Sequence, residues 1–170
     1  TIICEEERIK QIEIKKLNLR KILIMPNIPD FINKIGYNKQ IKDIKLLKIS
    51  YVGILGSDRG ILELCEVVKK NNKIKLEIAG FGELDDDILN YSKNCNNISF
   101  KGKVDYLNGL QIMNESDLIY AMYYKSNKNH LYAAPNKYYE GLFLNKAIIT
   151  TKGTLVGDKT ERYDTGFVIE

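Results

Sequence analysis

The sequence predicts an α/β fold in which parallel strands alternate with helices. Three observations support this class: short apolar runs of strand length recur along the chain, segments with helical spacing of apolar residues lie between them, and turn residues separate the two. Strands that alternate with helices of this length form βαβ units, whose right-handed crossovers place helices on both faces of a parallel sheet. We therefore expect a Rossmann-like, doubly wound parallel sheet.

The elements follow in a regular order. Residues 1–4 and 21–26 are predicted to be strands on either side of a charged helix at 5–19, and residues 27–43 a polar linker. From residue 46 the alternation is strong, because apolar runs and helical patterns follow without a gap. Further strands are predicted at 46–53, 74–80, 97–102, 117–124, 147–150 and 165–170, and helices at 58–71, 83–95, 106–116 and from Pro135.

Composition excludes several classes of protein. The 170 residues carry a net charge of only +4, and their basic side chains are scattered among acids, which argues against a nucleic-acid-binding face. The three cysteines are far apart and form no C-x-x-C pair, so neither a zinc site nor a disulfide framework is indicated. No apolar stretch approaches membrane-spanning length, and the N-terminus lacks a signal-peptide pattern. We expect a cytoplasmic protein.

The first candidate for a functional site is the stretch YVGILGSDRG at the end of the predicted strand 46–53. Gly53, Gly56 and Gly60 flank a strand-to-helix turn, where glycine allows close approach of a ligand to the backbone. The helix N-terminus favours anions, and Arg59 adds a planar cation suited to phosphate oxygens. The stretch is therefore either a diphosphate-binding turn or a tight turn with a solvated arginine.

The second candidate, IAGFGELDDDI, resembles a dinucleotide-binding G-x-G-x-x-G only in part. Gly80 and Gly82 occupy the first two glycine positions, but the third is Asp85. Three successive aspartates at 85–87 would repel a pyrophosphate, which argues against the dinucleotide motif. The aspartates could bind a metal, but acids at the start of a helix also complement its dipole, and we favour that interpretation.

The third candidate is PNKYYE. Pro135 suits the first position of a helix, and Asn136, Lys137 and Glu140 then share one helical face at its N-terminus. A carboxylate here could accept hydrogen bonds from two vicinal hydroxyl groups, and a lysine could balance phosphate charge. The alternative is an exposed Lys–Glu pair of little energetic value. His130, in the preceding polar loop, is either a ligand contact or a solvated residue.

Six stretches resemble, in order and spacing, motifs of the C-terminal domain of GT-B-fold glycosyltransferases of the group 1 type. YVGILGSDRG is similar to that family's strand, G-R-L, loop and K-G, LEIAGFGE to its I-A-G-x-G, and ISFKGKV to its strand ending in G-x-V. SDLIYAMYY is similar to its A-D and apolar strand, PNKYYEGLFLNKAIITTKG to its variant P-N-K segment, and YDTGFVI to its D-G-x-x-G ending. The resemblance covers the chain from about residue 46 to its end.

The resemblance implies that this domain binds a nucleotide-sugar donor and that the enzyme retains anomeric configuration. Arg59 takes the place of the family's lysine beside the donor diphosphate, where Gly53, Gly56, Asn136 and Lys137 are also expected. Glu140 takes the place of the second glutamate of the family's E-x7-E motif, which binds the ribose hydroxyls.

The remaining implied roles concern the base and the shape of the cleft. The backbone near Lys103 and Val104 is where the family presents polar groups to the base, and Gly80 and Gly82 shape the cleft. No catalytic residue is assigned, no metal site is expected, and no cofactor beyond the nucleotide-sugar substrate is implied.

The sequence departs from the family at two positions. Ile54 stands where the family has the G-R-L arginine, and Tyr132 stands where it has the first glutamate of E-x7-E. Lys137 would offset the lost positive charge. Residues 1–45 resemble the end of the family's N-terminal domain and the interdomain linker, since KILIMPNIPD is similar to its strand-P-N-x-x-D. We therefore expect a fragment: a domain tail and linker at 1–45, followed by a nucleotide-sugar-binding domain at 46–170.

The sequence thus predicts a glycosyltransferase fragment whose full-length form transfers a glycosyl unit from a nucleotide-diphosphate sugar to a polysaccharide or lipid-linked acceptor. The acceptor would bind the missing N-terminal domain, and peripheral membrane association of the full-length enzyme stays open. Three alternatives remain: a dinucleotide-dependent oxidoreductase, a non-catalytic module that keeps the fold, and a nucleic-acid binder.

Overall fold

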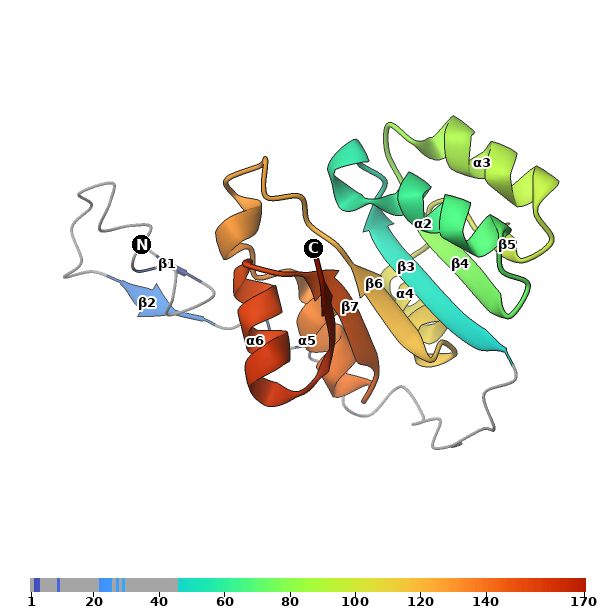
Figure 1. The fold of residues 1–170 in the computed structure, drawn as a ribbon. Coiled ribbons are helices and arrows are strands. Elements are labelled where there is room, and N and C mark those ends of the chain that lie inside the picture. Colours follow the sequence, from blue (N-terminus) through green and yellow to red (C-terminus); the bar gives the residue numbers. More distant parts are fainter. Residues whose placement is uncertain (1, 4–8, 10–21, 26, 28, 30–45) are drawn as a thin grey trace.

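The computed structural model describes residues 2–3, 9, 22–25, 27, 29 and 46–170 (Figure 1). The strands predicted near the N-terminus are present as β1 (Ile2–Ile3) and β2 (Leu23–Ile24), which pair in parallel. Most of the helix predicted at 5–19 and of the linker at 27–43 lies outside the described residues. The domain boundary near residue 45 therefore stays a prediction.

The main part of the chain forms a six-stranded parallel sheet with the order β5-β4-β3-β6-β7-β8 (Figure 1). In chain order, β3, β4 and β5 lie side by side toward one edge of the sheet. The chain then returns, and β6 pairs with the other side of β3. This arrangement confirms the predicted doubly wound α/β fold, and it puts a topological switch point between β3 and β6. The strands are β3 (Leu47–Ile54), β4 (Ile74–Phe81), β5 (Ile98–Phe100), β6 (Leu118–Ala121), β7 (Ala147–Thr151) and β8 (Gly166–Ile169).

Helices cover both faces of this sheet. Side chains of α2 and α3 pack with Tyr51 and Ile78 in one core cluster, whereas α4 and the end of α5 pack with Ile119 in another. Alternate residues of a strand point to opposite faces, so Tyr51 and Val52 of β3 enter different clusters. The helical elements are η3 (Ser57–Arg59), α2 (Ile61–Lys69), α3 (Asp85–Asn94), α4 (Tyr106–Asn114), η4 (His130–Tyr132), α5 (Asn136–Phe143) and α6 (Leu155–Tyr163).

The helix α6 was not predicted, because its sequence is mostly polar and contains Gly157. A local signal was available at each end. The Thr154 hydroxyl accepts a hydrogen bond from the Gly157 N–H at 3.0 Å, which caps the helix N-terminus. Asp164 adopts a left-handed conformation (φ 51°) that ends the helix.

Two boundaries also differ from the predictions. The sheet pairing of β6 ends at Ala121 rather than near Tyr124, and the chain beyond it turns into the loop before η4. Pro135 is the extended residue before α5 (ψ 139°) instead of its first helical residue. Within the described residues, every helix is too short or too polar to span a lipid bilayer.

Candidate functional site

A cavity of about 570 Å³ opens at the carboxyl ends of β3 and β6, at the switch point of the sheet. Its size is that of sites for small organic ligands. Two of the predicted site residues, Gly56 and Gly82, are not part of its lining. The structure brings together the other eight: Gly53, Arg59, Gly80, Lys103, Val104, Asn136, Lys137 and Glu140.

The ammonium group of Lys137 lies in an unusual environment. Its Nζ atom is 3.5 Å from the centroid of the Tyr51 ring, and it lies beside Gly53 of β3. Burial of the ammonium group lowers the pKa of Lys137 to about 7, and the nearby positive charge of Arg59 adds to this effect. The negative charge of Glu140 raises the pKa and so acts in the opposite direction. The residue as a whole is only partly buried. An anion placed beside the amine would favour its charged form.

Arg59, at the end of η3, is held by its neighbour Asp58 and by the ring of Tyr123, which follows β6. Its Nε atom is 3.3 Å from Oδ1 of Asp58, and its guanidinium carbon lies 4.7 Å from the centroid of the Tyr123 ring. Its Nη1 atom is buried and has no hydrogen-bond partner in the described part of the protein. A buried donor without a partner is costly, so a ligand acceptor at this position would stabilise the site.

Glu140 is one of the few charged side chains in the interior, with 6% of its surface exposed. Burial raises the pKa of Glu140, while a hydrogen bond from the hydroxyl of Tyr106 and the charge of Lys137 act in the opposite direction. The pKa of Tyr106 is raised to about 12, by burial first and then by Glu140. The α5 face predicted from sequence spacing therefore points into the cavity, as does the N-terminus of α4 that carries Tyr106.

Part of the cavity wall is apolar. Ile54 and Phe81 are paired in register at the ends of β3 and β4, and both line the cavity with large exposed fractions, 62% and 50%. The Lys103 ammonium lies 5.1 Å from the centroid of the Phe81 ring. Val104 lines the cavity next to Lys103. A flat aromatic or heterocyclic group would find apolar walls here.

The glycines act in two ways. Gly53 has φ +145°, and a Cβ atom there would come within 3.3 Å of the Lys137 Nζ atom. At Gly80, a Cβ atom would lie 1.8 Å from the Gly53 carbonyl oxygen, so this residue permits β3 and β4 to approach. Gly82 is similarly crowded by the backbone of Leu55, and Gly56 is packed beside Asp58.

The acidic start of α3 is accounted for by local hydrogen bonding. Asp85 accepts a hydrogen bond from the Gly82 N–H at 2.7 Å, and the three aspartates lie in the first turn of the helix. Glu83 accepts a hydrogen bond from the Ser57 N–H and so joins this turn to η3. Among the described residues, no group of three or more His, Cys, Asp or Glu side chains could hold a metal ion.

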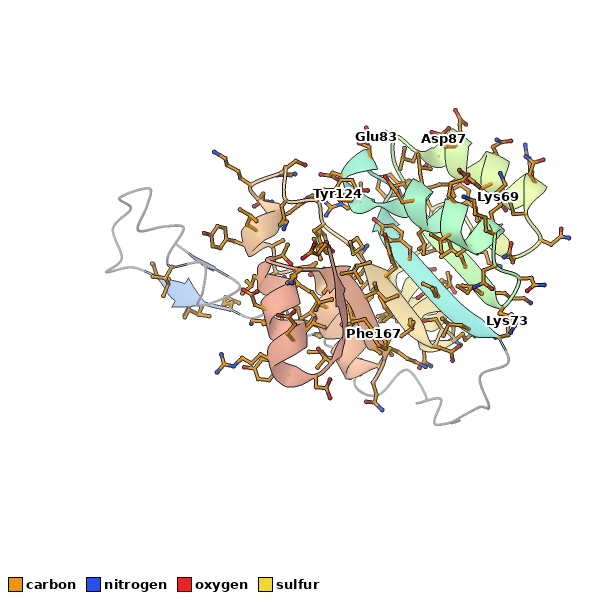
Figure 2. All side chains as sticks on the ribbon, viewed as in Figure 1. Lys69, Lys73, Glu83, Asp87, Tyr124 and Phe167 are labelled. Atoms are coloured by element: carbon orange, nitrogen blue, oxygen red, sulfur yellow. The ribbon has the colours of Figure 1, made fainter. Side chains whose placement is uncertain are left out.

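Figure 2 shows Glu83 and Tyr124 at the carboxyl end of the sheet, with Lys73 at the opposite end. The loop after Tyr124 carries His130, for which the sequence left a ligand contact or a solvated residue open, and the structure places His130 in the lining of the cavity. His130 is not solvated: only 3% of its surface is exposed, and both of its ring nitrogens are within hydrogen-bond distance of protein atoms. Tyr132, which stands where the resembled motif has a glutamate, does not line the cavity.

Sequence reasoning also missed a contact from the N-terminal part. Asn27, at the start of the predicted linker, donates a hydrogen bond from Nδ2 to the Ala134 carbonyl oxygen at 2.8 Å. It shares a smaller cavity of about 180 Å³ with Tyr106, Asn136 and Glu140. The P-N-x-x-D motif was the signal for this residue, but its spatial partner lies 107 positions away in the chain.

The chain resembles glycosyltransferases of known structure. TarM of S. aureus, in a complex with fondaparinux, α-GlcNAc-glycerol and UDP, is 18% identical with a TM-score of 0.66, over 99% of this chain and 33% of that chain. WaaG, a glycosyltransferase involved in lipopolysaccharide biosynthesis, is 15% identical with a TM-score of 0.71, over 99% and 48%. HepE of Anabaena, in a complex with UDP and glucose, is 14% identical with a TM-score of 0.63, over 98% and 48%.

These identities establish a shared fold and nothing finer. The chain spans a third to a half of the length of these three proteins. The likeness to the C-terminal domain of GT-B glycosyltransferases, predicted from the sequence motifs, is thereby confirmed at the level of the fold. No family model and no curated protein matches the sequence.

Proposed function

We propose that the domain at 46–170 binds a nucleotide-diphosphate sugar in the cavity at the switch point. The observation that carries this proposal is the convergence of Arg59, Lys137 and Glu140, two cations and one buried carboxylate from two separate elements, on one cavity. A diphosphate linked to a ribose presents the matching groups, namely anionic oxygens beside a pair of vicinal hydroxyls. The presence of UDP in TarM and HepE supports this choice of ligand.

The diphosphate would lie between Arg59 and Lys137, near the backbone of Gly53. The unpartnered Nη1 of Arg59 would donate to a phosphate oxygen, and the Lys137 amine would become fully charged beside it. Asn136, at the start of α5, would contact the same group. Gly56 would act only indirectly, by shaping the turn that carries Arg59.

The nucleoside would extend away from these cations. Glu140 would accept hydrogen bonds from the two ribose hydroxyls, in competition with the hydroxyl of Tyr106. The base would lie against Phe81, close to the backbone of Lys103 and Val104. Gly80 would keep β3 and β4 close enough for this wall to form.

In the full-length enzyme, the domain would hold the donor while the glycosyl unit passes to an acceptor. We propose a retaining transferase that acts on a polysaccharide or lipid-linked glycan, with the acceptor bound by a further domain of the full-length enzyme. Arg59, Lys137 and helix N-termini would stabilise the charge that develops on the leaving nucleotide. The 170-residue chain alone would bind the donor weakly and have no transferase activity.

The proposal is tested by calorimetry on the 170-residue chain with UDP, GDP and their sugars. Binding in the range of ten micromolar to millimolar supports it, and a folded protein that gives no heat at millimolar concentrations of these ligands contradicts it. Titration with NAD tests the dinucleotide alternative. A non-catalytic module that keeps the fold but has lost the site would bind no nucleotide, even in the full-length protein.

The variant Glu140→Gln tests the ribose contact with little change of shape. We expect about a tenfold loss of UDP affinity, because a hydrogen bond to a charged group contributes about 1.5–3 kcal/mol. Glu161→Ala, an exposed carboxylate on α6, is the matched control and should bind as the wild type does. Equal affinity of Glu140→Gln and wild type would remove Glu140 from the proposed site.

A further inference from the structure

His130 is the single histidine of the sequence, and its hydrogen bonds define its orientation. Its Nδ1 atom lies 2.9 Å from the carbonyl oxygen of Tyr124. A carbonyl oxygen can only accept, so Nδ1 carries a proton. The other nitrogen, Nε2, faces Oδ2 of Asp58 at 3.3 Å and Nδ2 of Asn127 at 3.2 Å. With the proton on Nδ1, Nε2 of the neutral ring accepts from the Asn127 amide.

Asp58 connects the histidine to Arg59. One oxygen of its carboxylate faces the imidazole, and the other lies 3.3 Å from the Arg59 Nε atom. The carboxylate thus lies between the two side chains. Asn127 also donates to Asp58, from Nδ2 to Oδ2 at 3.2 Å.

The ring of Tyr123 completes the arrangement from the end of β6. The Arg59 guanidinium stacks on this ring, and the His130 ring meets the same residue edge-on with centroids 5.4 Å apart. The backbone N–H of Tyr124 donates to the carbonyl of Asp58 at 3.0 Å. The turn after β3 and the loop after β6 are therefore joined across the switch point by side chains and backbone together.

We propose that His130 is a positioning residue, which holds Arg59 in the cavity by orienting the Asn127 amide that donates to the carboxylate of Asp58. The proposal rests on the proposed function, in which Arg59 meets the donor diphosphate. A long arginine side chain loses conformational freedom when it binds an anion, and a side chain already held in place loses less. Tyr123 limits the guanidinium from one side, and Asp58 holds Nε from another, so Nη1 remains for the ligand.

Two variants of His130 separate its two hydrogen bonds. The amide of His130→Gln reaches the position of Nε2, where its oxygen can accept from Asn127 as the ring nitrogen does. The shorter amide of His130→Asn reaches the position of Nδ1 and keeps only the contact with Tyr124. Ser126→Ala, an exposed residue of the same loop, is the control for a general effect on the loop.

The first measurement compares UDP with uridine on the 170-residue chain. We expect His130→Asn to weaken UDP binding about tenfold and to leave uridine binding within about twofold, because residues of one hydrogen-bonded network are energetically coupled. His130→Gln should restore most of the UDP affinity. In the double variant with Asp58→Asn, the loss should not exceed that of the larger single variant. Equal weakening of UDP and uridine, or additive losses, would overturn the proposal.

The second measurement needs no ligand. The Nε–H group of Arg59, assigned with Arg59→Lys, is followed by ¹⁵N relaxation in the free protein. We expect it to be ordered in the wild type and in His130→Gln, and mobile in His130→Asn. An ordered Arg59 in all three would contradict the positioning role, whether or not nucleotide binds. A wild type that binds no nucleotide would instead count against the proposed function alone.

Discussion

Lys137 shows how one buried amine connects stability with function. Its pKa is lowered from 10.5 to about 7 because its ammonium group is enclosed against the Tyr51 ring and lies near Arg59. Between these two pKa values the unfolded chain binds more protons than the folded one, so the free energy of unfolding rises with pH in this window. Below about pH 7 the full cost of burying the charge is present.

We therefore predict that the destabilising effect of the buried Lys137 charge decreases as pH rises from 7 to 8.5. Relative to Lys137→Met, which keeps the apolar stem, wild type should gain roughly 1 kcal/mol over this range, after allowance for the partial exposure of the side chain. Urea denaturation of both proteins at several pH values measures this gain. Parallel pH profiles would show that the amine is solvated in the folded state.

At the residue scale, sequence reasoning found Arg59, Lys137 and Glu140 because each lies just after a strand or at a helix N-terminus. It did not find Asp58, Tyr123 or the burial of His130. Their significance depends on contacts between the turn after β3 and the loop after β6, and no local pattern encodes such contacts.

At the scale of elements, the close approach of β3 and β4 depends on Gly80. A Cβ atom at this position would lie 1.8 Å from the backbone oxygen of Gly53, and no side-chain movement can relieve that contact. The variant Gly80→Ala should lose about 3 kcal/mol or more of unfolding free energy.

Gly102→Ala is the matched control for Gly80→Ala. Gly102, like Gly80, has a positive φ (+65°), but a Cβ atom at Gly102 would meet no heavy atom within 4 Å. It should lose only the local strain of about 1–2 kcal/mol. Chemical denaturation compares the two, and similar losses would mean that the strands can separate to admit the methyl group.

The helices differ in how far their sequences predict them. In α2, buried residues recur at Ile61, Leu64, Cys65 and Val68, so the apolar face is readable from spacing alone. In α6, the buried apolar residues Leu155 and Val156 both lie at the start of the helix and only Gly157 and Thr160 are buried after them, so no helical apolar spacing can be read. That helix is stabilised by capping and by packing against β7 and β8 instead.

At the scale of the whole molecule, two thiols report on the integrity of one core. Cys65 and Cys95 are buried in the same apolar cluster, with exposed fractions of 0% and 8%, and burial raises the pKa of Cys65 to about 12. Because the thiolate is the reactive form, native protein should resist maleimide at these two positions.

Peptide mass spectrometry after labelling, with and without urea, measures this protection. We expect Cys65 and Cys95 to react at similar rates, and only when the domain opens as a whole. Rapid labelling of either thiol in protein with native circular dichroism would show that the cluster opens locally.

The sequence by itself determined the alternation of strands and helices and the polar residues at the strand ends. The reason is that the spacing of apolar side chains and the backbone preferences of glycine and proline depend on only a few neighbouring residues. Only the tertiary structure decided that β3 lies beside β6, with Ile49 paired to Leu118. That pairing places the Arg59 guanidinium on the ring of Tyr123 and the Asp58 carboxylate beside the His130 imidazole. The physical reason is that hydrogen bonds between parallel strands join segments far apart in the chain, and their choice depends on how the whole core packs.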